Sequence, residues 1–204
     1  MPNYFPPLLP NRTYHLQSWS NGFEKLFYKQ ENYRFFLERF IKYVYPVAEL
    51  YAYSLQPDHF DLLIHVRNTE SIKKHFNILK PELIFDQSKV SRFIMQCFSN
   101  MLNSYAKSFN KVYQRRGSVF IDYIKRLEII SNEELCNSII QIHKSPVYFG
   151  HCRKMEQWKW SSFRNYNHQY PYIISTNKVL KLFGGKRNFL ALHNVARNRQ
   201  LVHF

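Results

Sequence analysis

The sequence predicts an α+β domain, in which helices pack on a mixed or antiparallel sheet and a C-terminal extension follows. Three features of the chain lead to this fold class. Segments rich in β-favouring residues alternate with segments of helical periodicity, two of the strand segments are separated only by a short turn, and no repeat interrupts the series. The predicted order is strand, helix, strand, strand, helix, strand, helix.

The first half of the chain contains three predicted strands and one helix. Residues 13–19 (TYHLQSW) alternate in polarity and are rich in aromatic residues, which is typical of a strand. Residues 32–44 carry apolar side chains at steps of three and four, which predicts an amphipathic helix. Residues 48–55 and 59–66 are predicted strands, and Pro57–Asp58 forms the turn between them.

The second half of the chain contains the longest predicted helix, over residues 91–113, where apolar residues form one stripe. An acidic first turn is favourable at the positive end of a helix and predicts another one over residues 132–142, ended by Pro146. The remaining predicted elements are a short helix and loop over 73–85, a strand over 118–130, and a helical pair over 176–192 broken at Gly184 and Gly185.

The length of 204 residues predicts one domain with terminal segments. We expect a tail over residues 1–11, a folded domain over 12–165 and a basic, aromatic extension over 166–204. A hydrophobic content of 45% excludes a disordered chain, and 5 Gly and 9 Pro exclude collagen-like and linker-like chains.

The chain is strongly basic, because 29 Lys and Arg against 14 Asp and Glu give a net charge of +15. Such a charge repels itself, and a polyanionic partner offsets this cost, so nucleic acid is the leading partner. A solvated basic surface and an anionic membrane are the alternatives. We expect a cytoplasmic protein, because the chain lacks a long apolar window, a signal-peptide pattern and the cysteine spacing of a disulfide framework.

One predicted strand carries polar residues with the potential for chemistry. Side chains alternate in a strand, so His59 and Asp61 share a face while Phe60 and Leu62 point to the core. The imidazole and the carboxylate can hold one divalent cation or form an ion pair. The alternative is a solvated polar pair on an exposed strand face.

Four blocks of sequence occur in a specific order and spacing. They are residues 50–64 (LYAYSLQPDHFDLLI), 104–120 with SYAKSFNK and RRGSVF, 142–163 with IH, PV, G and WKWSSF, and 183–193 with FGG, Phe189 and His193. Together the blocks resemble the single-tyrosine HUH transposases, especially the REP-associated branch. The resemblance covers roughly residues 12–193.

The resemblance implies a ferredoxin-like domain that binds DNA hairpins with adjoining single strand. In this family two histidines of the central strand and an amide side chain hold Mg²⁺ or Mn²⁺, which polarises a phosphate. A tyrosine on a late helix attacks that phosphate and becomes joined to the DNA. The resemblance also implies a transposase of a bacterial mobile element, which acts in DNA transposition and DNA recombination.

This sequence departs from the family at the active positions. His59 matches the first histidine, but Asp61 stands in place of the second, and Ser145 stands where the family has its metal-binding amide. Gln141 stands where the family has its nucleophilic tyrosine, and an amide cannot form a phosphodiester. A carboxylate is a good ligand for Mg²⁺ or Mn²⁺. If the protein is active, we therefore expect altered metal binding at His59, Asp61 and Ser145, and otherwise no cofactor.

Basic and aromatic residues that we expect to contact DNA occur together in the middle of the chain. Cations bind phosphates and aromatic faces stack on unpaired bases. The alternative is a solvated basic face with its tyrosines in the core. The predicted DNA-binding residues are Arg92, Lys107, Lys111, Arg115, Arg116, Lys125, Arg126, Tyr105 and Tyr113.

The leading hypothesis is therefore a transposase-like protein that binds hairpin or single-stranded DNA without cleaving it. The first alternative is an active metal-dependent transposase or nuclease, with Asp61 as ligand and a displaced tyrosine (Tyr105, Tyr113 or Tyr148) as nucleophile. The second is a basic scaffold that binds protein. His143 points away from Gln141 on the predicted helix and is expected to pack, and Trp158 and Trp160 are expected to be core anchors.

Overall fold

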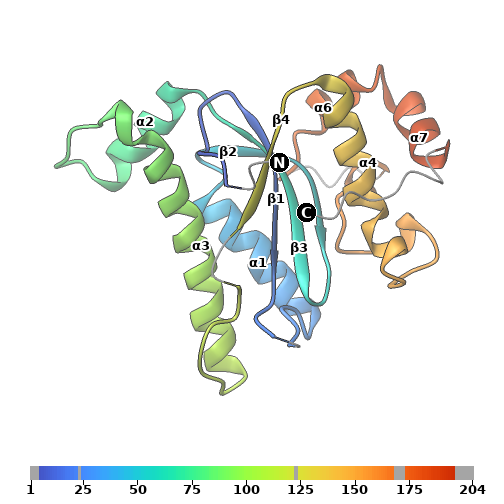
Figure 1. Cartoon of the computed structure of the whole chain (residues 1–204), viewed down its shortest axis with the longest axis horizontal. Coiled ribbons are helices and arrows are strands. Elements are labelled where there is room, and N and C mark those ends of the chain that lie inside the picture. The colour runs from blue at the N-terminus through green and yellow to red at the C-terminus, as the bar shows by residue number, and fades with distance from the viewer. Residues whose placement is uncertain (1–4, 23, 122–123, 168–172, 196–204) are drawn as a thin grey trace.

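A four-stranded antiparallel sheet with helices on both faces forms the centre of the molecule (Figure 1). The computed structural model describes residues 5–22, 24–121, 124–167 and 173–195, so the expected tail 1–11 and extension 166–204 fall only partly within the described residues. The elements in chain order are β1 (Thr13–Trp19), α1 (Gln30–Tyr43), β2 (Ala48–Leu55), β3 (His59–Val66), α2 (Thr69–Leu79), η1 (Gln87–Lys89), α3 (Val90–Val112), β4 (Lys125–Ile129), α4 (Asn132–Tyr148), η2 (Met155–Gln157), α5 (Phe163–Asn167), α6 (Thr176–Leu182) and α7 (Lys186–Val195).

The strand order is β2-β3-β1-β4, and every neighbouring pair is antiparallel. A tight turn joins β2 to β3, whereas helices connect β1 to β2 and β3 to β4. This βαββαβ connection with the two central strands β1 and β3 is the ferredoxin-like arrangement. The predicted α+β fold class is confirmed.

One face of the sheet packs on α1 and α3 and forms the main apolar core. Phe36 of α1 contacts the ring of Phe60 of β3 with 4.9 Å between centroids, and Tyr105 of α3 packs edge-on against Phe36. These side chains come from the helix stripes and from the alternate positions of β3 that the sequence assigned to the core. Burial of such a stripe supplies most of the stability of an amphipathic helix.

The opposite face is covered by α4, which packs on β2 and β3 and lies on the other side of the sheet from α3 in Figure 1. His143 of α4 is fully buried, with its Nδ1 2.9 Å from His193 Nε2 and its Nε2 2.7 Å from Ser162 Oγ. The prediction that His143 packs is therefore confirmed. Phe189 of α7 lies in the same cluster, so α7 packs against α4 through the rings of Phe189 and His193.

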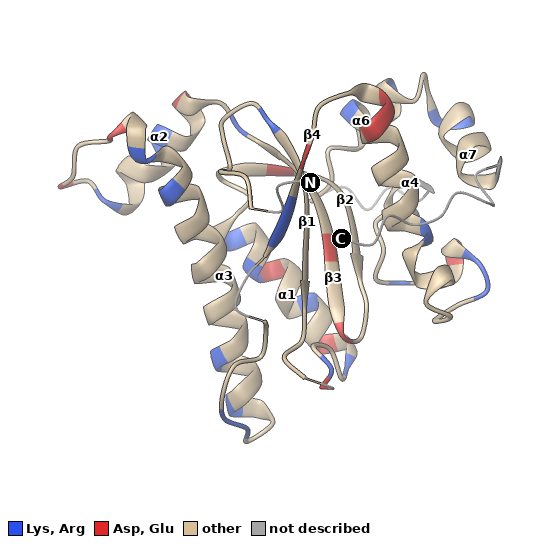
Figure 2. Cartoon of the chain, in the orientation of Figure 1, with Lys and Arg blue, Asp and Glu red and all other residues tan. Residues whose placement is uncertain are grey.

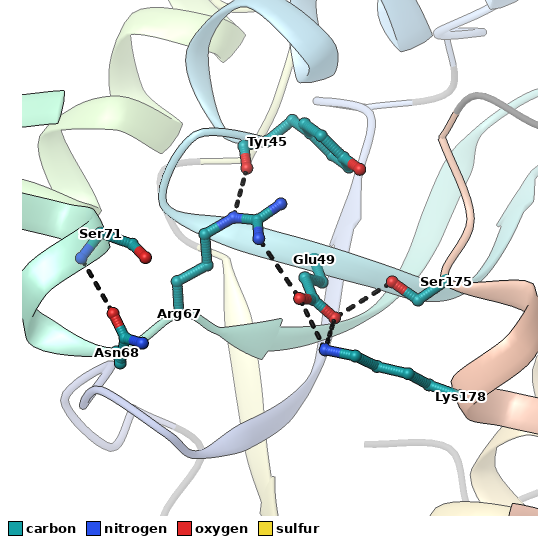
Figure 3. A network of polar contacts seen from close by, with 7 residues as sticks. All are labelled: Tyr45, Glu49, Arg67, Asn68, Ser71, Ser175 and Lys178. Atoms are coloured by element: carbon teal, nitrogen blue, oxygen red, sulfur yellow. Dashed lines mark hydrogen bonds and ion pairs between the residues drawn. The ribbon is translucent and has the colours of Figure 1, made fainter. Parts of the chain in front are cut away.

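A polar network ties α6 to the sheet (Figure 3). Glu49 of β2 accepts hydrogen bonds from Arg67 Nη1 at 3.2 Å, from Ser175 Oγ at 3.1 Å and from Lys178 Nζ at 2.8 Å. Arg67 also donates to the Tyr45 carbonyl oxygen at 3.0 Å. Burial of Glu49 acts to raise its pKa, but the bonds from Lys178 and Ser175 outweigh this and lower it, so the carboxylate is held charged.

The structure corrects three predicted boundaries. The strand expected over 118–130 is observed at Lys125–Ile129, and the described residues before it contribute an isolated bridge, between Ser20 and Phe120. The helix α4 continues past Pro146 to Tyr148, although a proline cannot donate the backbone hydrogen bond of that turn, and Gly150 with a positive φ of 74° ends the helix. The helix α2 begins at Thr69, because the Asn68 side chain accepts from Ser71 N and caps it.

The other helices and strands agree with the sequence analysis. The bounds of β1, β2 and β3 are those predicted, and the expected helical pair is α6 and α7. Within the described ranges, no helix is both long enough and apolar enough to cross a membrane.

The buried pair of His143 and His193 predicts a loss of stability in acid. Burial lowers the pKa of His193 to about 4 and, together with the charge of His193, lowers that of His143. The folded state thus binds fewer protons than the unfolded state below the ordinary histidine pKa of about 6.5. We expect the free energy of unfolding to fall by at least about 2 kcal/mol between pH 7.5 and pH 5, the contribution of His193 alone, measured by urea denaturation.

The variant His193→Phe keeps an aromatic ring in the cluster and removes one of the two buried bases, so its stability should fall less over the same pH range. His75→Gln changes a half-buried histidine on α2 and serves as the control, which should keep most of the wild-type pH dependence. Identical pH dependence in wild type and His193→Phe would contradict this assignment.

Candidate functional site

The sheet face beneath α4 carries a row of buried polar side chains. The strand register places Gln17 of β1 and Ser54 of β2 on either side of Asp61, and Trp19 of β1 opposite His59. His59 is 1% exposed and Asp61 is 3% exposed. The alternative that this polar pair is a solvated feature of an exposed strand is therefore wrong, because α4 closes over it.

Carboxylates and imidazoles alternate along this row. Asp58 Oδ1 lies 2.7 Å from His59 Nδ1, His59 Nε2 lies 3.8 Å from Asp61 Oδ2, and Asp61 Oδ1 lies 2.9 Å from His15 Nε2. The hydrogen bond from His59 is the largest cause of the lowered pKa of Asp58. Since a carboxylate only accepts, His59 Nδ1 carries the proton, and a neutral His59 presents its lone pair at Nε2.

Several buried atoms in this row lack a hydrogen-bond partner among the described residues. They include His59 Nε2, Gln56 Oε1 and Gln17 Oε1. All three can accept, and buried acceptors without a donor are costly unless a ligand satisfies them. The row is therefore suited to a positively charged ligand.

Gln56 is a site residue that sequence reasoning missed. Its backbone N–H donates to His59 O at 2.8 Å, so the two residues face each other across the β2–β3 turn. Its side-chain Nε2 donates to Ser145 Oγ at 2.5 Å. Ser145, which was predicted to bind the metal, therefore contacts Gln56. The side-chain carbonyl oxygen of Gln56 remains available to a bound cation. In the sequence, the one indication of this role is that Gln56 lies directly before the Pro57 turn and so close to His59.

The donor set fits Mg²⁺ or Mn²⁺. The 3.8 Å between His59 Nε2 and Asp61 Oδ2 is too long for a hydrogen bond, but it is shorter than two metal–ligand bonds of about 2.1 Å each, so one cation can touch both atoms. The Asp58–His59 bond is the kind of outer contact that orients a metal-binding imidazole. The part of the chain that the structure describes holds no group of three His, Cys, Asp or Glu ligands, so a third ligand has to be an amide, a hydroxyl or water.

The helix α4 also positions Gln141, which lies one turn before Ser145 on the same helix face and is half-buried. Tyr148, one turn beyond the site, is 60% exposed and touches the ring of Phe149, which in turn contacts His59 with 4.8 Å between centroids. Of the three tyrosines considered as displaced nucleophiles, only Tyr148 lies on the helix that covers His59.

The structure argues against a role of Tyr105 in DNA contact or catalysis. It is 1% exposed, its hydroxyl donates to the Leu26 carbonyl oxygen at 2.5 Å, and burial raises its pKa strongly. Tyr113 is half-buried and donates to Asn32 Oδ1 at 2.9 Å, within the α1–α3 layer. Both tyrosines therefore belong to the helix face of the sheet, away from His59.

The predicted cations do not form one cluster (Figure 2). Figure 2 shows basic segments at the lower end of α3 and, apart from these, on β4. Arg92 and Lys111 are about 28 Å apart along α3 at 1.5 Å per residue. The exposed members of the predicted set are Arg92, Lys107, Lys111 and Arg116.

Two predicted DNA-binding arginines are engaged by the protein itself. Arg115 forms an ion pair with Glu24 and donates to Asn110 Oδ1 at 3.0 Å. Arg126 lies against Met95 Sδ at 2.9 Å, and its burial lowers its pKa. Side chains alternate along β4, so Arg126 points to the α3 face while its neighbour Lys125 shares the face of Gln17.

The buried pair of Asp61 and His15 predicts strong energetic coupling. In a double-mutant cycle of Asp61→Ala and His15→Ala, measured by chemical denaturation, we expect a coupling energy of about 1–3 kcal/mol, because each single variant removes a short polar contact of a buried partner. Asp86 and Lys89 form an exposed pair at the same 2.9 Å and supply the matched control, with a smaller expected coupling because solvent screens the two charges. Equal coupling in the two cycles would exclude a buried ion pair.

The comparison with solved structures supports the fold. No protein-family model matches the chain, and no curated protein sequence matches it. Among solved structures, the chain is similar to a REP-associated tyrosine transposase bound to a REP hairpin. The two are 15% identical, with a TM-score of 0.55 over 85% of this chain and 90% of the other. At this identity the likeness establishes that this chain shares the fold of that transposase.

Proposed function

We propose that this protein binds DNA hairpins and adjoining single strands as a transposase-like protein, without cleaving them. The observation that carries the proposal is the shared fold with a transposase whose structure contains a hairpin, over 85% of this chain. The net charge of +15 supports a polyanionic partner, and the exposed cations of α3 and the following loop are available to phosphates.

Gln141 supports binding without cleavage. Its half-buried amide occupies the place expected for the nucleophile, and an amide side chain cannot attack phosphorus to give a stable link to DNA. The surrounding fold is intact, since the strand register, the β2–β3 turn and the packing of α4 all hold His59 and Asp61 in place.

We also propose that His59 and Asp61 hold Mg²⁺ or Mn²⁺, with the carbonyl oxygen of Gln56 available beside them. When bound, the cation would neutralise charge on a DNA phosphate. Asp58 fixes the ring of His59, and His15 fixes the carboxylate of Asp61. In this proposal the metal site positions the DNA backbone and does not require a chemical step.

A second candidate function is cleavage by Tyr148, which its exposure beside Phe149 favours. In that reaction the Tyr148 oxygen forms a bond to phosphorus, the bond from phosphorus to the 3′-oxygen breaks, and the phenol proton is lost to solvent while the leaving 3′-oxygen takes one up. The product is a 5′-phosphotyrosine that survives denaturation. The two candidate functions therefore differ in a single observable, a covalent adduct.

The DNA-binding proposal predicts salt-dependent affinity for a labelled hairpin with a single-stranded extension. We expect tighter binding to this DNA than to a duplex of equal length, and about a 100-fold loss between 50 and 200 mM salt if four phosphates are contacted. The combined variant Lys107→Glu and Lys111→Glu should weaken binding, whereas the control Lys73→Glu and Lys74→Glu on α2 carries the same charge change and should weaken it less. Affinity that is independent of salt would count against the proposal.

The same samples, denatured after incubation with Mn²⁺, test for cleavage. We expect no protein–DNA adduct from the wild type. An adduct that disappears in Tyr148→Phe would instead establish the second candidate function.

The metal proposal predicts that Mn²⁺ binds the free protein, as seen by electron paramagnetic resonance and by a raised thermal midpoint. His59→Ala and Asp61→Asn should each lose the bound signal. Asp86→Asn removes an exposed carboxylate elsewhere and should retain it. Binding that is unchanged in both site variants would show that the cation lies elsewhere.

A further inference from the structure

A row of aromatic rings extends from the buried site to the surface. The ring of Trp19 stacks near His59 at 5.7 Å, and His59 meets Phe149 edge-on at 4.8 Å. The row continues with Phe149 stacked near His151 at 6.4 Å, and His151 stacked on Trp158 at 5.3 Å with an angle of 26° between the planes. Five rings from three separate segments of the chain thus line up at the end of the sheet where β1 stops and β3 begins.

The outer part of this row is presented to solvent. Phe149 is 40% exposed, His151 is exposed and Trp158 is half-buried. Neither Phe149 nor Trp158 belongs to the described apolar core, so the expectation of a core anchor is wrong for Trp158, whereas Trp160 does pack against the core. One edge of Trp158 is fixed, because its indole N–H donates to the Leu55 carbonyl oxygen at 3.0 Å, and its ring lies against His151.

The backbone fixes the outer rings relative to each other. Phe149 is the C-cap of α4, and Gly150 has a φ of 74°, the left-handed conformation that turns the chain directly after a helix. The His151 N–H then donates to the Pro146 carbonyl oxygen at 2.8 Å. A rigid platform loses little conformational entropy when it binds a flat ligand.

Basic residues flank the row on both sides. Lys125 Nζ lies 5.3 Å from the Trp19 ring, and Arg153 and Lys154 are exposed in the loop between His151 and Trp158. Gln157 Oε1 accepts from the backbone N–H groups of both loop residues, at 3.0 and 3.1 Å, and so holds the loop in shape. Asp58, an acid beside the row, has its carboxylate engaged by His59.

We propose that the outer rings of Phe149, His151 and Trp158 bind an unpaired base of single-stranded DNA, with the flanking cations on its phosphates. The inference rests on the proposed DNA-binding function and specifies the path of the single strand. Stacked aromatic faces beside cations are the combination that holds unpaired nucleotides, whereas a cationic rim is a poor match for an apolar protein segment. Because His59 belongs to the same row, a nucleotide stacked on Phe149 places its backbone next to the proposed metal site.

The experiment compares two hairpins of identical stem, one blunt and one with a four-nucleotide extension containing 2-aminopurine. Binding of the full-length chain to each is measured by anisotropy, and stacking is followed by quenching of the 2-aminopurine. Phe149→Leu removes the aromatic face but keeps an apolar side chain against His59. Tyr28→Leu is the matched control, since Tyr28 is an aromatic residue of comparable exposure, 49%, that stacks on Phe109 in the other layer.

We expect Phe149→Leu to weaken binding to the extended hairpin by about 5- to 100-fold, the effect of losing one stacked base, and to abolish the quenching. Binding to the blunt hairpin and the thermal midpoint should stay at the wild-type values, and Tyr28→Leu should change neither affinity. His151→Ser should show the same selective loss as Phe149→Leu.

Two results would overturn the inference while leaving the hairpin binding of the proposed function standing. One is a wild-type protein that binds both hairpins equally well. The other is a Phe149→Leu variant with unchanged affinity for the extended hairpin, as expected if the row contacts a protein instead. A wild-type protein that binds neither hairpin would overturn the proposed function and the inference together.

Discussion

The burial of Asp61 is the constraint on which the arrangement of the site depends. A carboxylate that is 3% exposed is stable as an anion only if the protein supplies compensating partners. His15 on the neighbouring strand supplies one at 2.9 Å, and His59 lies on the other side at 3.8 Å. These contacts require the strand order that makes β1 and β3 neighbours. The polar contacts of the site therefore depend on the ferredoxin-like topology.

The same burial depends on α4 and therefore on the end of the chain. The helix can cover β2 and β3 only if its own buried His143 is satisfied, and Ser162 and His193 provide for this from segments after the helix. Ser162 also bonds to the backbone of β2, and Glu49 fastens α6 to the same strand. Residues beyond position 160 thus act on the site through the position of the helix that closes it.

The sequence predicted the features that local patterns determine. The bounds of β1, β2 and β3 follow from alternation and turn residues a few positions away, whereas the ferredoxin-like arrangement was implied by the family resemblance. It failed where a distant partner decides the outcome. In the sequence Arg126 resembles a phosphate ligand, but in the fold β4 directs its side chain toward Met95. Gln56 resembles an ordinary turn residue, but its amide contacts Ser145, 89 positions later.

The retained part of the site is itself informative about function. His59 Nε2 and Gln56 Oε1 are buried without a donor among the described residues, and such an atom costs about 1–3 kcal/mol unless a ligand or water satisfies it. The contact between Asp58 and His59 maintains this arrangement by directing the lone pair of His59 inward. A site that had only decayed would be expected to fill with apolar side chains, which are often more stable than buried charges. The unsatisfied acceptors beside Asp61 therefore agree with the proposal that this site binds a cation.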